Sequence, residues 1–107
     1  MTPIRTLAAA DDDLLLAADR LEAARRGFGG RLLDTYRHAV EAAETQPRFH
    51  PQVDDPVPGY ECRNAAPARY RYRVIYVVLP AELLIVAVAH TSMRPGSWHD
   101  RLPTPPP

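Results

Sequence analysis

Three arginines at alternate positions are the most unusual chemical feature of this sequence. Arg69, Arg71 and Arg73 are interleaved with tyrosines, and alternation of this kind is typical of a β-strand with two distinct faces. The three guanidinium groups would share one face. Like charges so close together are mildly unfavourable unless an anionic or acidic partner neutralises them. We therefore favour a partner-binding surface over a merely solvated face, in which Glu61 would pair with one of the arginines.

A wholly apolar run over residues 83–89 follows this strand. The connection over residues 79–82 is short and contains a proline, which predicts an antiparallel hairpin. A strand that is apolar at every position is usually covered on both faces and lies inside a sheet. It needs a neighbour on each side, and the weak strand signal at residues 4–8 is the remaining candidate.

Two helical patterns lie upstream of the hairpin. The first is predicted to open at Asp11–Asp13, because acids in a first turn complement the helix dipole. The second is predicted from about Arg31 to Thr45, and the glycines of residues 27–30 separate the two. The order β-α-α-β-β-β predicts an α+β fold, with an N-terminal strand and a helical hairpin packed on a mostly antiparallel four-stranded sheet.

The remaining segments are rich in proline. Residues 47–59 contain four prolines and are predicted to form an exposed loop on which His50 lies. Trp98 is expected to dock on the sheet or the helices. We predict one domain over residues 1–102, and a proline-rich disordered tail at residues 103–107.

Composition excludes several classes of protein. The 107 residues include 13 basic residues, all of them arginine, and 13 acidic ones, so the formal net charge is zero, whereas a dedicated nucleic-acid binder is usually clearly basic. The excess of acids in residues 1–58 and of arginines in residues 59–107 still allows one basic face. A lone cysteine, Cys62, and the lack of a signal-peptide layout or a long apolar run indicate a cytoplasmic protein without a membrane segment.

Other residues with possible chemistry give weaker signals. The triple aspartate resembles a carboxylate metal cluster, but adjacent residues on a helix point in different directions, so we expect no metal and no cofactor. Cys62 lacks a pattern of histidine and asparagine partners and is not expected to be catalytic. His90 ends an apolar strand, where a structural hydrogen bond is favoured over catalysis.

Several motifs together resemble the RelE/ParE superfamily of toxins from type II toxin–antitoxin modules, also called plasmid stabilisation proteins. The strand Arg69–Tyr76 is similar to the family's R-F-P-Y-x-V-x-Y pattern, with Arg71 in place of the usual proline. The segment Val86–Arg101 is similar to V-A-V-A-H…R-x-P-x-Y-W-x-x-R, with Ser97 in place of the usual tyrosine. The Gly27-Phe28-Gly29 break and Gln46-Pro47 after the second helix also fit. The likeness extends over about residues 4–101.

The resemblance implies a growth-inhibitory toxin that a cognate antitoxin holds inactive. Some members of the family act through DNA gyrase, and others cut messenger RNA in the ribosomal A site. The antitoxin's N-terminal part binds the operator, so this chain would reach operator DNA only through its antitoxin. A third possibility is a homologue that has lost toxicity and acts only as an antitoxin-bound corepressor.

The ribonuclease alternative implies a metal-independent mRNA interferase. Such a site needs a base, cations for the pentavalent phosphate and an acid for the leaving oxygen. The candidate catalytic residues are Arg63, Arg73, His90 and Arg94, expected on one sheet face with Arg69 and Arg71. However, Glu61 stands where the family pattern has a lysine, and Trp98 stands near the expected tyrosine. This incomplete set favours the ParE-like branch, which acts through DNA gyrase.

Two further sets of residues follow from the resemblance. The antitoxin is expected in a groove between the helical hairpin and the sheet, on Leu14, Leu21, Tyr36, Val40, Arg69 and Arg71. The candidate target-binding residues are Arg94, Trp98 and Arg101, although Trp98 and Arg101 are favoured as residues that fix the C-terminal segment. Arg101 could do so by stacking on an aromatic ring.

Overall fold

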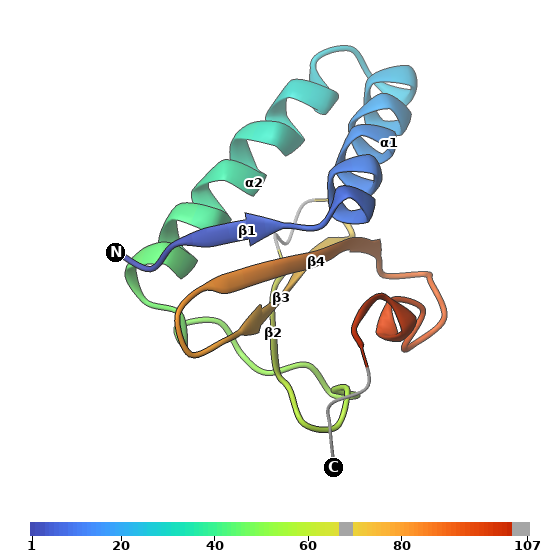
Figure 1. The fold of residues 1–107 in the computed structure, drawn as a ribbon. Helices are drawn as coiled ribbons and strands as arrows, with labels where there is room; N and C mark the ends of the chain where they lie inside the picture. Colours follow the sequence, from blue (N-terminus) through green and yellow to red (C-terminus); the bar gives the residue numbers. More distant parts are fainter. Residues whose placement is uncertain (67–69, 104–107) are drawn as a thin grey trace.

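The computed structural model describes residues 1–66 and 70–103. In chain order these residues form β1 (Ile4–Thr6), α1 (Ala8–Ala24), α2 (Phe28–Thr45), β2 (Glu61–Ala65), β3 (Tyr72–Val78), β4 (Leu83–His90) and a short 3₁₀ helix (His99–Arg101) (Figure 1). The order β-α-α-β-β-β and the α+β architecture predicted from the sequence are confirmed.

The apolar strand β4 lies inside the sheet, as its sequence predicts. The strand order is β1-β4-β3-β2, with β1 parallel to β4 and the other two pairings antiparallel. All residues of β4 from Leu83 to Ala89 are buried. Val86 is an extra residue between the partners of Ile75 and Tyr76, and this bulge turns Val86 and Ala87 into the same apolar cluster.

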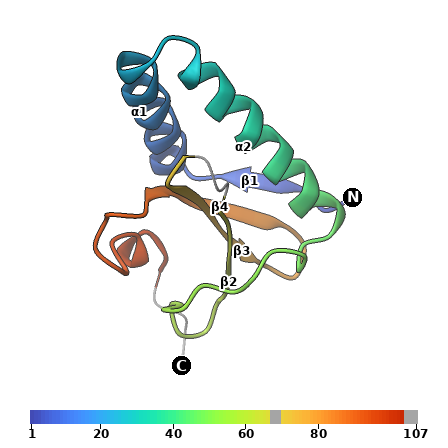
Figure 2. The same cartoon turned by 180° about the vertical axis from the view of Figure 1, so that it is seen from behind.

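The helical hairpin covers one face of the sheet, and its far end extends beyond the sheet (Figures 1 and 2). Val74 and Tyr76 of β3 pack with alanines of both helices, Ala10 and Ala43. Small side chains on the helices allow this close approach to large side chains on the strands. The hairpin is therefore held by the alternation of β3, which presents every second residue to the helices.

Both helices begin three residues earlier than the sequence analysis predicted. The Leu7 N–H continues the ladder of β1 by donating to the Ile85 carbonyl, and its own carbonyl accepts from Ala10 and Asp11, so α1 starts directly after the strand. At the hairpin turn, Gly27 has a φ of 90°. The Glu22 carboxylate accepts hydrogen bonds from the N–H groups of Gly27 and Gly29, which caps α2 from the preceding helix.

The second face of the sheet is covered by residues 47–59 and by the C-terminal segment that contains the 3₁₀ helix. Residues 47–59 form a mostly exposed loop, as predicted, but Val53 is an exception. Val53 is buried in one cluster with Trp98 and Leu102. Gln52 forms an antiparallel bridge with Arg63, and the Val53 N–H donates to the Cys62 carbonyl, so this segment lies along the free edge of β2. Its apolar residues were hidden among prolines in the sequence.

Strand β3 begins at Tyr72, so the row of three strand arginines is not present as predicted. Arg69 lies outside the described residues. Arg71 is exposed in a turn with a φ of 52°, and its carbonyl accepts from the Thr91 N–H. Of Arg71 and Arg73, the two that lie in the described residues, Arg73 belongs to the strand and Arg71 does not. The left-handed residue at position 71 ends the alternation there.

Candidate functional site

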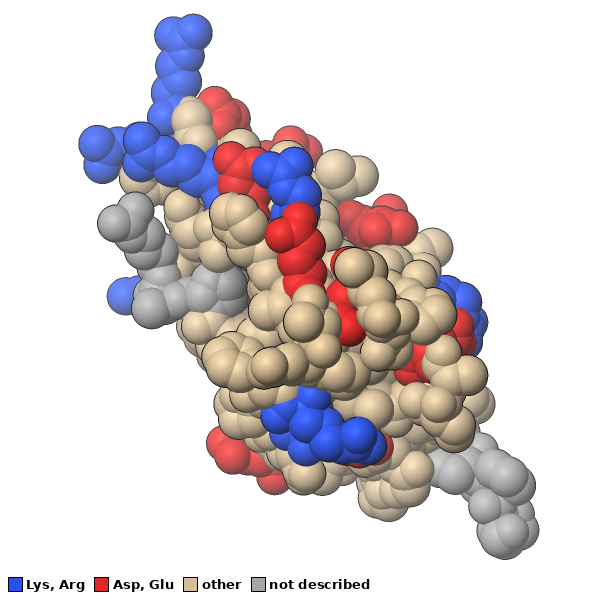
Figure 3. Space-filling model, turned by 90° about the vertical axis from the view of Figure 1, so that its left-hand side faces the viewer, with Lys and Arg blue, Asp and Glu red and all other residues tan. Residues whose placement is uncertain are grey.

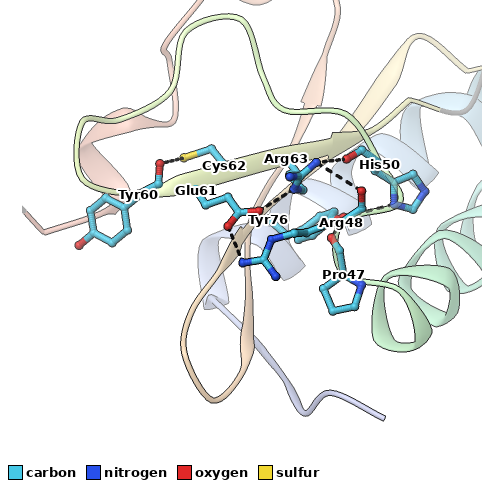
Figure 4. A network of polar contacts seen from close by, with 8 residues as sticks. All are labelled: Pro47, Arg48, His50, Tyr60, Glu61, Cys62, Arg63 and Tyr76. Atoms are coloured by element: carbon cyan, nitrogen blue, oxygen red, sulfur yellow. Dashed lines mark hydrogen bonds and ion pairs between the residues drawn. The ribbon is translucent and has the colours of Figure 1, made fainter.

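Arg63 is fixed in a network that joins β2 to the segment after α2 (Figure 4). Its Nε donates to Glu61 at 2.8 Å, and its Nη1 donates to the carbonyl of His50 at 2.8 Å. Glu61 also accepts from Arg48 at 2.8 Å. Glu61 therefore pairs with Arg48 and Arg63. Its pairing with an arginine near β3 belonged to the less favoured alternative of a solvated strand face. The guanidinium of Arg63 holds the fold together and is not free to contact a phosphate.

The same network changes the acid–base properties of its members. The hydrogen bond from Arg48, followed by that from Arg63, lowers the pKa of Glu61 despite the opposing effect of desolvation. Burial lowers the pKa of His50 and raises the pKa of Tyr76. The Tyr76 hydroxyl donates to the Pro47 carbonyl at 2.8 Å and lies 3.3 Å from Nδ1 of His50. Both rings therefore have structural partners.

Arg63 and Arg73 lie on opposite faces of the sheet. Arg63 is opposite Tyr76 in the β2–β3 register, and Tyr76 packs under the helices. Arg73 is opposite Ala89 in the β3–β4 register, and Ala89 belongs to the cluster on the other face. Directly opposed residues of an antiparallel pair share a face. The candidate ribonuclease residues are therefore not brought together on one sheet face, which corrects the sequence expectation.

Arg73 lies at a cleft of about 400 Å³ on the face away from the helices. The cleft is also lined by Asp54, Asp55, Thr91, Met93 and Pro95. Arg94, the exposed neighbour of two of these residues, lies in the turn that follows β4. The cleft thus combines one arginine with two carboxylates, and the acids would repel a phosphate backbone.

His90 is already engaged at the end of β4. Its Nδ1 accepts from the Ser92 N–H at 3.0 Å and lies 2.6 Å from the Ser92 hydroxyl. The neutral ring then carries its proton on Nε2, so neither nitrogen offers a free lone pair to a substrate hydroxyl. The ring also packs edge-on against Tyr72, with the centroids 5.0 Å apart. This geometry agrees with the structural hydrogen bond that the sequence analysis favoured.

The C-terminal segment is anchored by two of the three candidate target-binding residues. Trp98 is buried on the sheet, as expected, with 2% of its surface exposed. Arg101 does not stack on a ring among the described residues; its guanidinium forms a two-point ion pair with Asp13, with distances of 2.6 and 3.1 Å. Of the three, Arg94 alone is exposed.

Asp13 is a residue whose role the sequence analysis missed. Its carboxylate accepts from the Val88 N–H at 3.0 Å, while Arg101 donates to the Val86 carbonyl at 3.0 Å. These backbone groups belong to the edge of β4 that the short strand β1 leaves uncovered. Beyond the end of β1, this pair of side chains therefore supplies the hydrogen bonds that a longer strand would have made to β4. The acidic run at residues 11–13 was the visible signal, but its partner is 88 residues away.

The apolar residues proposed for antitoxin binding are partly buried. Leu14, Leu21 and Tyr36 pack against the cluster between the hairpin and one end of the sheet, and Val40 packs against the neighbouring cluster. None of the four is fully buried, so each leaves some apolar surface. Burial, with a smaller effect of Asp11, raises the pKa of Tyr36.

The largest apolar exposure on the helices lies at residues that the sequence analysis did not select. Leu15 and Leu16 are 60% and 51% exposed, and Leu33 is 39% exposed. Gly29 approaches Ala18 closely. Leu15 is one turn before Ala18 and Leu33 one turn after Gly29, so both leucines lie near the seam between the helices. The leucine run at residues 14–16 was the signal that could have identified them.

The other candidate groups give no reactive centre. Cys62 is buried, and burial raises the pKa of its thiol, which disfavours a nucleophilic thiolate. In the described part of the chain, no three side chains of His, Cys, Asp or Glu gather as a metal site would require. None of the helices in residues 1–66 and 70–103 has the length and apolar character needed to cross a membrane.

A helical hairpin packed on one face of a four-stranded sheet is an architecture that also occurs in solved structures of bacterial proteins. The chain matches a chain of the structure described as "Chromosomal ParDE TA system from P. aeruginosa", with a TM-score of 0.60 and 17% sequence identity. The match covers 84% of this chain and 96% of that chain. At this level of identity the likeness shows a common fold. No protein-family model and no curated protein matches the sequence.

Proposed function

We propose that this chain is the toxin of a type II toxin–antitoxin module, growth-inhibitory when free and neutralised by a cognate antitoxin. The observation that carries the proposal is the fold shared over nearly the whole length of a chain from a ParDE system. The sequence motifs of β3, β4 and the C-terminal segment support it independently, because they resemble the RelE/ParE superfamily. The proposed site of action of this toxin is the cytoplasm.

The proposed target is DNA gyrase, as in the ParE-like branch. The support is the arrangement of the arginines. Arg63 is held by Glu61 and two backbone carbonyls, Arg73 lies on the opposite face, and neither ring nitrogen of His90 is available as a base. An RNA-cleaving site needs these groups to converge on one phosphate. Binding to a target protein needs no such convergence.

The proposed antitoxin surface lies along the helical hairpin. It includes the partly buried Leu14, Leu21, Tyr36 and Val40, together with the more exposed Leu15, Leu16 and Leu33. An amphipathic segment that buried these leucines would remove apolar surface from water, at a gain of roughly 25 cal/mol per Å². Arg71, exposed near the end of the hairpin, could pair with acids of that segment; the proposed role of Arg69 falls outside the described residues.

The proposed target contact is the turn after β4. Arg94 is exposed there, beside Met93, which is 47% exposed. Trp98 and Arg101 would contribute indirectly, because their burial and ion pairing hold this segment on the sheet. Arg94→Ala should therefore weaken target binding without unfolding the chain, whereas Trp98→Ala should do both.

The test is induced expression of the chain in a bacterial host, with messenger integrity and the DNA-damage response measured in parallel. The proposal expects growth arrest, filamentous cells, a damage response and intact messages, all relieved by the antitoxin from the adjacent gene. Rapid, translation-dependent loss of messages without a damage response would assign the ribonuclease activity instead. Normal growth with tight antitoxin binding would assign the corepressor role.

A further inference from the structure

Arginines that form no ion pair with another described residue gather at the free end of the helical hairpin. Residues 20–31 contain four arginines and a single carboxylate, Glu22. Figure 3 shows basic side chains projecting into solvent from the end of the molecule where the two helices meet. This concentration is unexpected from the totals, because the N-terminal half of the chain carries more acids than arginines.

Arg71 joins this group through an aromatic contact between two distant segments. Phe28, at the start of α2, packs edge-on against Tyr70, with the ring centroids 6.4 Å apart. Arg71 is the residue after Tyr70 and is exposed. The turn before β3 therefore lies beside the end of the hairpin. We call Arg25, Arg26, Arg31 and Arg71 the basic tip.

No ion pair with another described residue neutralises the positive charge of the basic tip. Among the described residues, the arginines that form ion pairs all lie outside the basic tip: they are Arg5, Arg37, Arg48, Arg63 and Arg101. The nearby carboxylate of Glu22 is engaged with the N–H groups of Gly27 and Gly29. Exposed guanidinium groups gathered at one end of the molecule create a positive potential that attracts an external anion.

Two members of the basic tip are held in place before any ligand binds. The guanidinium carbons of Arg25 and Arg31 lie 4.9 and 5.1 Å from the centroid of the Phe28 ring. The contact with the ring restricts these long side chains, while both residues remain exposed. Less side-chain entropy is therefore lost when they bind an anion.

We propose that the basic tip binds the phosphate backbone of duplex DNA. Arginine guanidinium groups match phosphate oxygens with paired hydrogen bonds. The tip projects outward, and a projecting set of arginines can follow the closely spaced phosphates of a duplex. This contact is direct, in contrast to the route through the antitoxin, and it goes beyond the proposed function. It does not depend on which target the toxin inhibits.

The test is fluorescence anisotropy with the isolated full-length chain and a 30-base-pair mixed-sequence duplex, without antitoxin, at several salt concentrations. The expected binding weakens steeply with salt, since each phosphate contact contributes a slope of about −0.9 in log K against log salt. The variant Arg25→Gln/Arg31→Gln should bind about tenfold more weakly and lose about two contacts from the slope.

A second variant and a matched control make the result decisive. Arg26→Gln/Arg71→Gln removes the same amount of charge but keeps the contacts of Arg25 and Arg31 with Phe28. This variant should therefore fold normally and still bind DNA more weakly, which tests the proposal even if the first variant folds poorly. Arg5→Gln/Arg37→Gln removes two exposed arginines elsewhere and should bind DNA like the original chain. Equal weakening in the control would overturn the proposal, as would salt-insensitive binding or tighter binding of a poly-glutamate peptide than of the duplex.

Discussion

Asp13 and Arg101 form a two-point ion pair that joins the first helix to the C-terminal segment. The distances are 2.6 Å from Nη1 to Oδ2 and 3.1 Å from Nη2 to Oδ1. The same two side chains bond the backbone of β4 at Val88 and Val86. This ion pair therefore satisfies backbone groups at the uncovered edge of β4. It also fixes the C-terminal segment, which follows the turn with the proposed target contact. The hydrogen bond and charge of Asp13 also raise the pKa of Arg101.

Replacement of Asp13 by asparagine should destabilise the fold. The change leaves a partly buried guanidinium without a counter-charge, and we expect a loss of about 1–3 kcal/mol in the free energy of unfolding. Urea denaturation measures it. Asp12→Asn, at an exposed neighbouring position, is the control and should change stability by less than about 0.5 kcal/mol. Equal effects of the two substitutions would mean that the ion pair contributes nothing.

Replacement of Gly29 by alanine should force the two helices apart. A Cβ at this position would lie 2.6 Å from the backbone oxygen of Ala18, which cannot move away without shifting α1. We expect a loss of about 1–3 kcal/mol. Gly30→Ala is a matched control, because nothing lies within 4 Å of its added Cβ and alanine favours a helix by about 0.5–1 kcal/mol. Thermal unfolding should move in opposite directions for the two variants, and similar midpoints would contradict the packing argument.

Stability should fall as the pH drops through the titration of His50. Burial lowers its pKa below the ordinary value of 6.5. Between the folded and unfolded pKa values the unfolded chain binds more protons, so stability is full above about pH 6.5 and is lost toward the folded pKa. His50→Gln should flatten this part of the stability–pH curve. An unaltered curve for His50→Gln would refute the assignment.

Substitutions of Arg63 and Arg73 should have different consequences. Arg63→Ala removes bonds to Glu61 and two carbonyls and should lower stability by about 1–3 kcal/mol. Arg73→Ala should change stability by less than about 0.5 kcal/mol. In a gyrase-directed toxin Arg73→Ala should also retain growth inhibition, measured by colony counts after induction. Abolition of toxicity by Arg73→Ala in a normally folded chain would instead favour the ribonuclease.

The sequence predicts the fold well because its signals are local. The alternation of β3, the apolar run of β4 and the glycines at residues 27–30 each specify an element or a break within a few neighbours. The need of β4 for two neighbours also leads correctly to β1 at its side. The early starts of both helices were missed because Leu7 and Glu22 supply the start signals through contacts made elsewhere in the fold.

The arrangement of the candidate site depends on distant pairings that local patterns do not contain. Whether Arg63 and Arg73 share a face depends on the register between β2 and β3, which the intervening turn sets. Asp13 and Arg101 meet only because α1 and the C-terminal segment both reach the edge of β4. Val53 is likewise buried by residues of the second face of the sheet, and these residues are distant from it in the sequence.

The proposed activity of this chain is growth inhibition through DNA gyrase. The most direct test is to incubate the purified chain with purified DNA gyrase, ATP and supercoiled plasmid, and then to add detergent and protease. A gyrase-directed toxin should cause linear plasmid to accumulate with increasing amounts of the chain, and Arg94→Ala should reduce that accumulation. Absence of linear plasmid, together with cutting of messenger RNA on translating ribosomes by the same preparation, would show that the chain is a ribonuclease and not a gyrase-directed toxin.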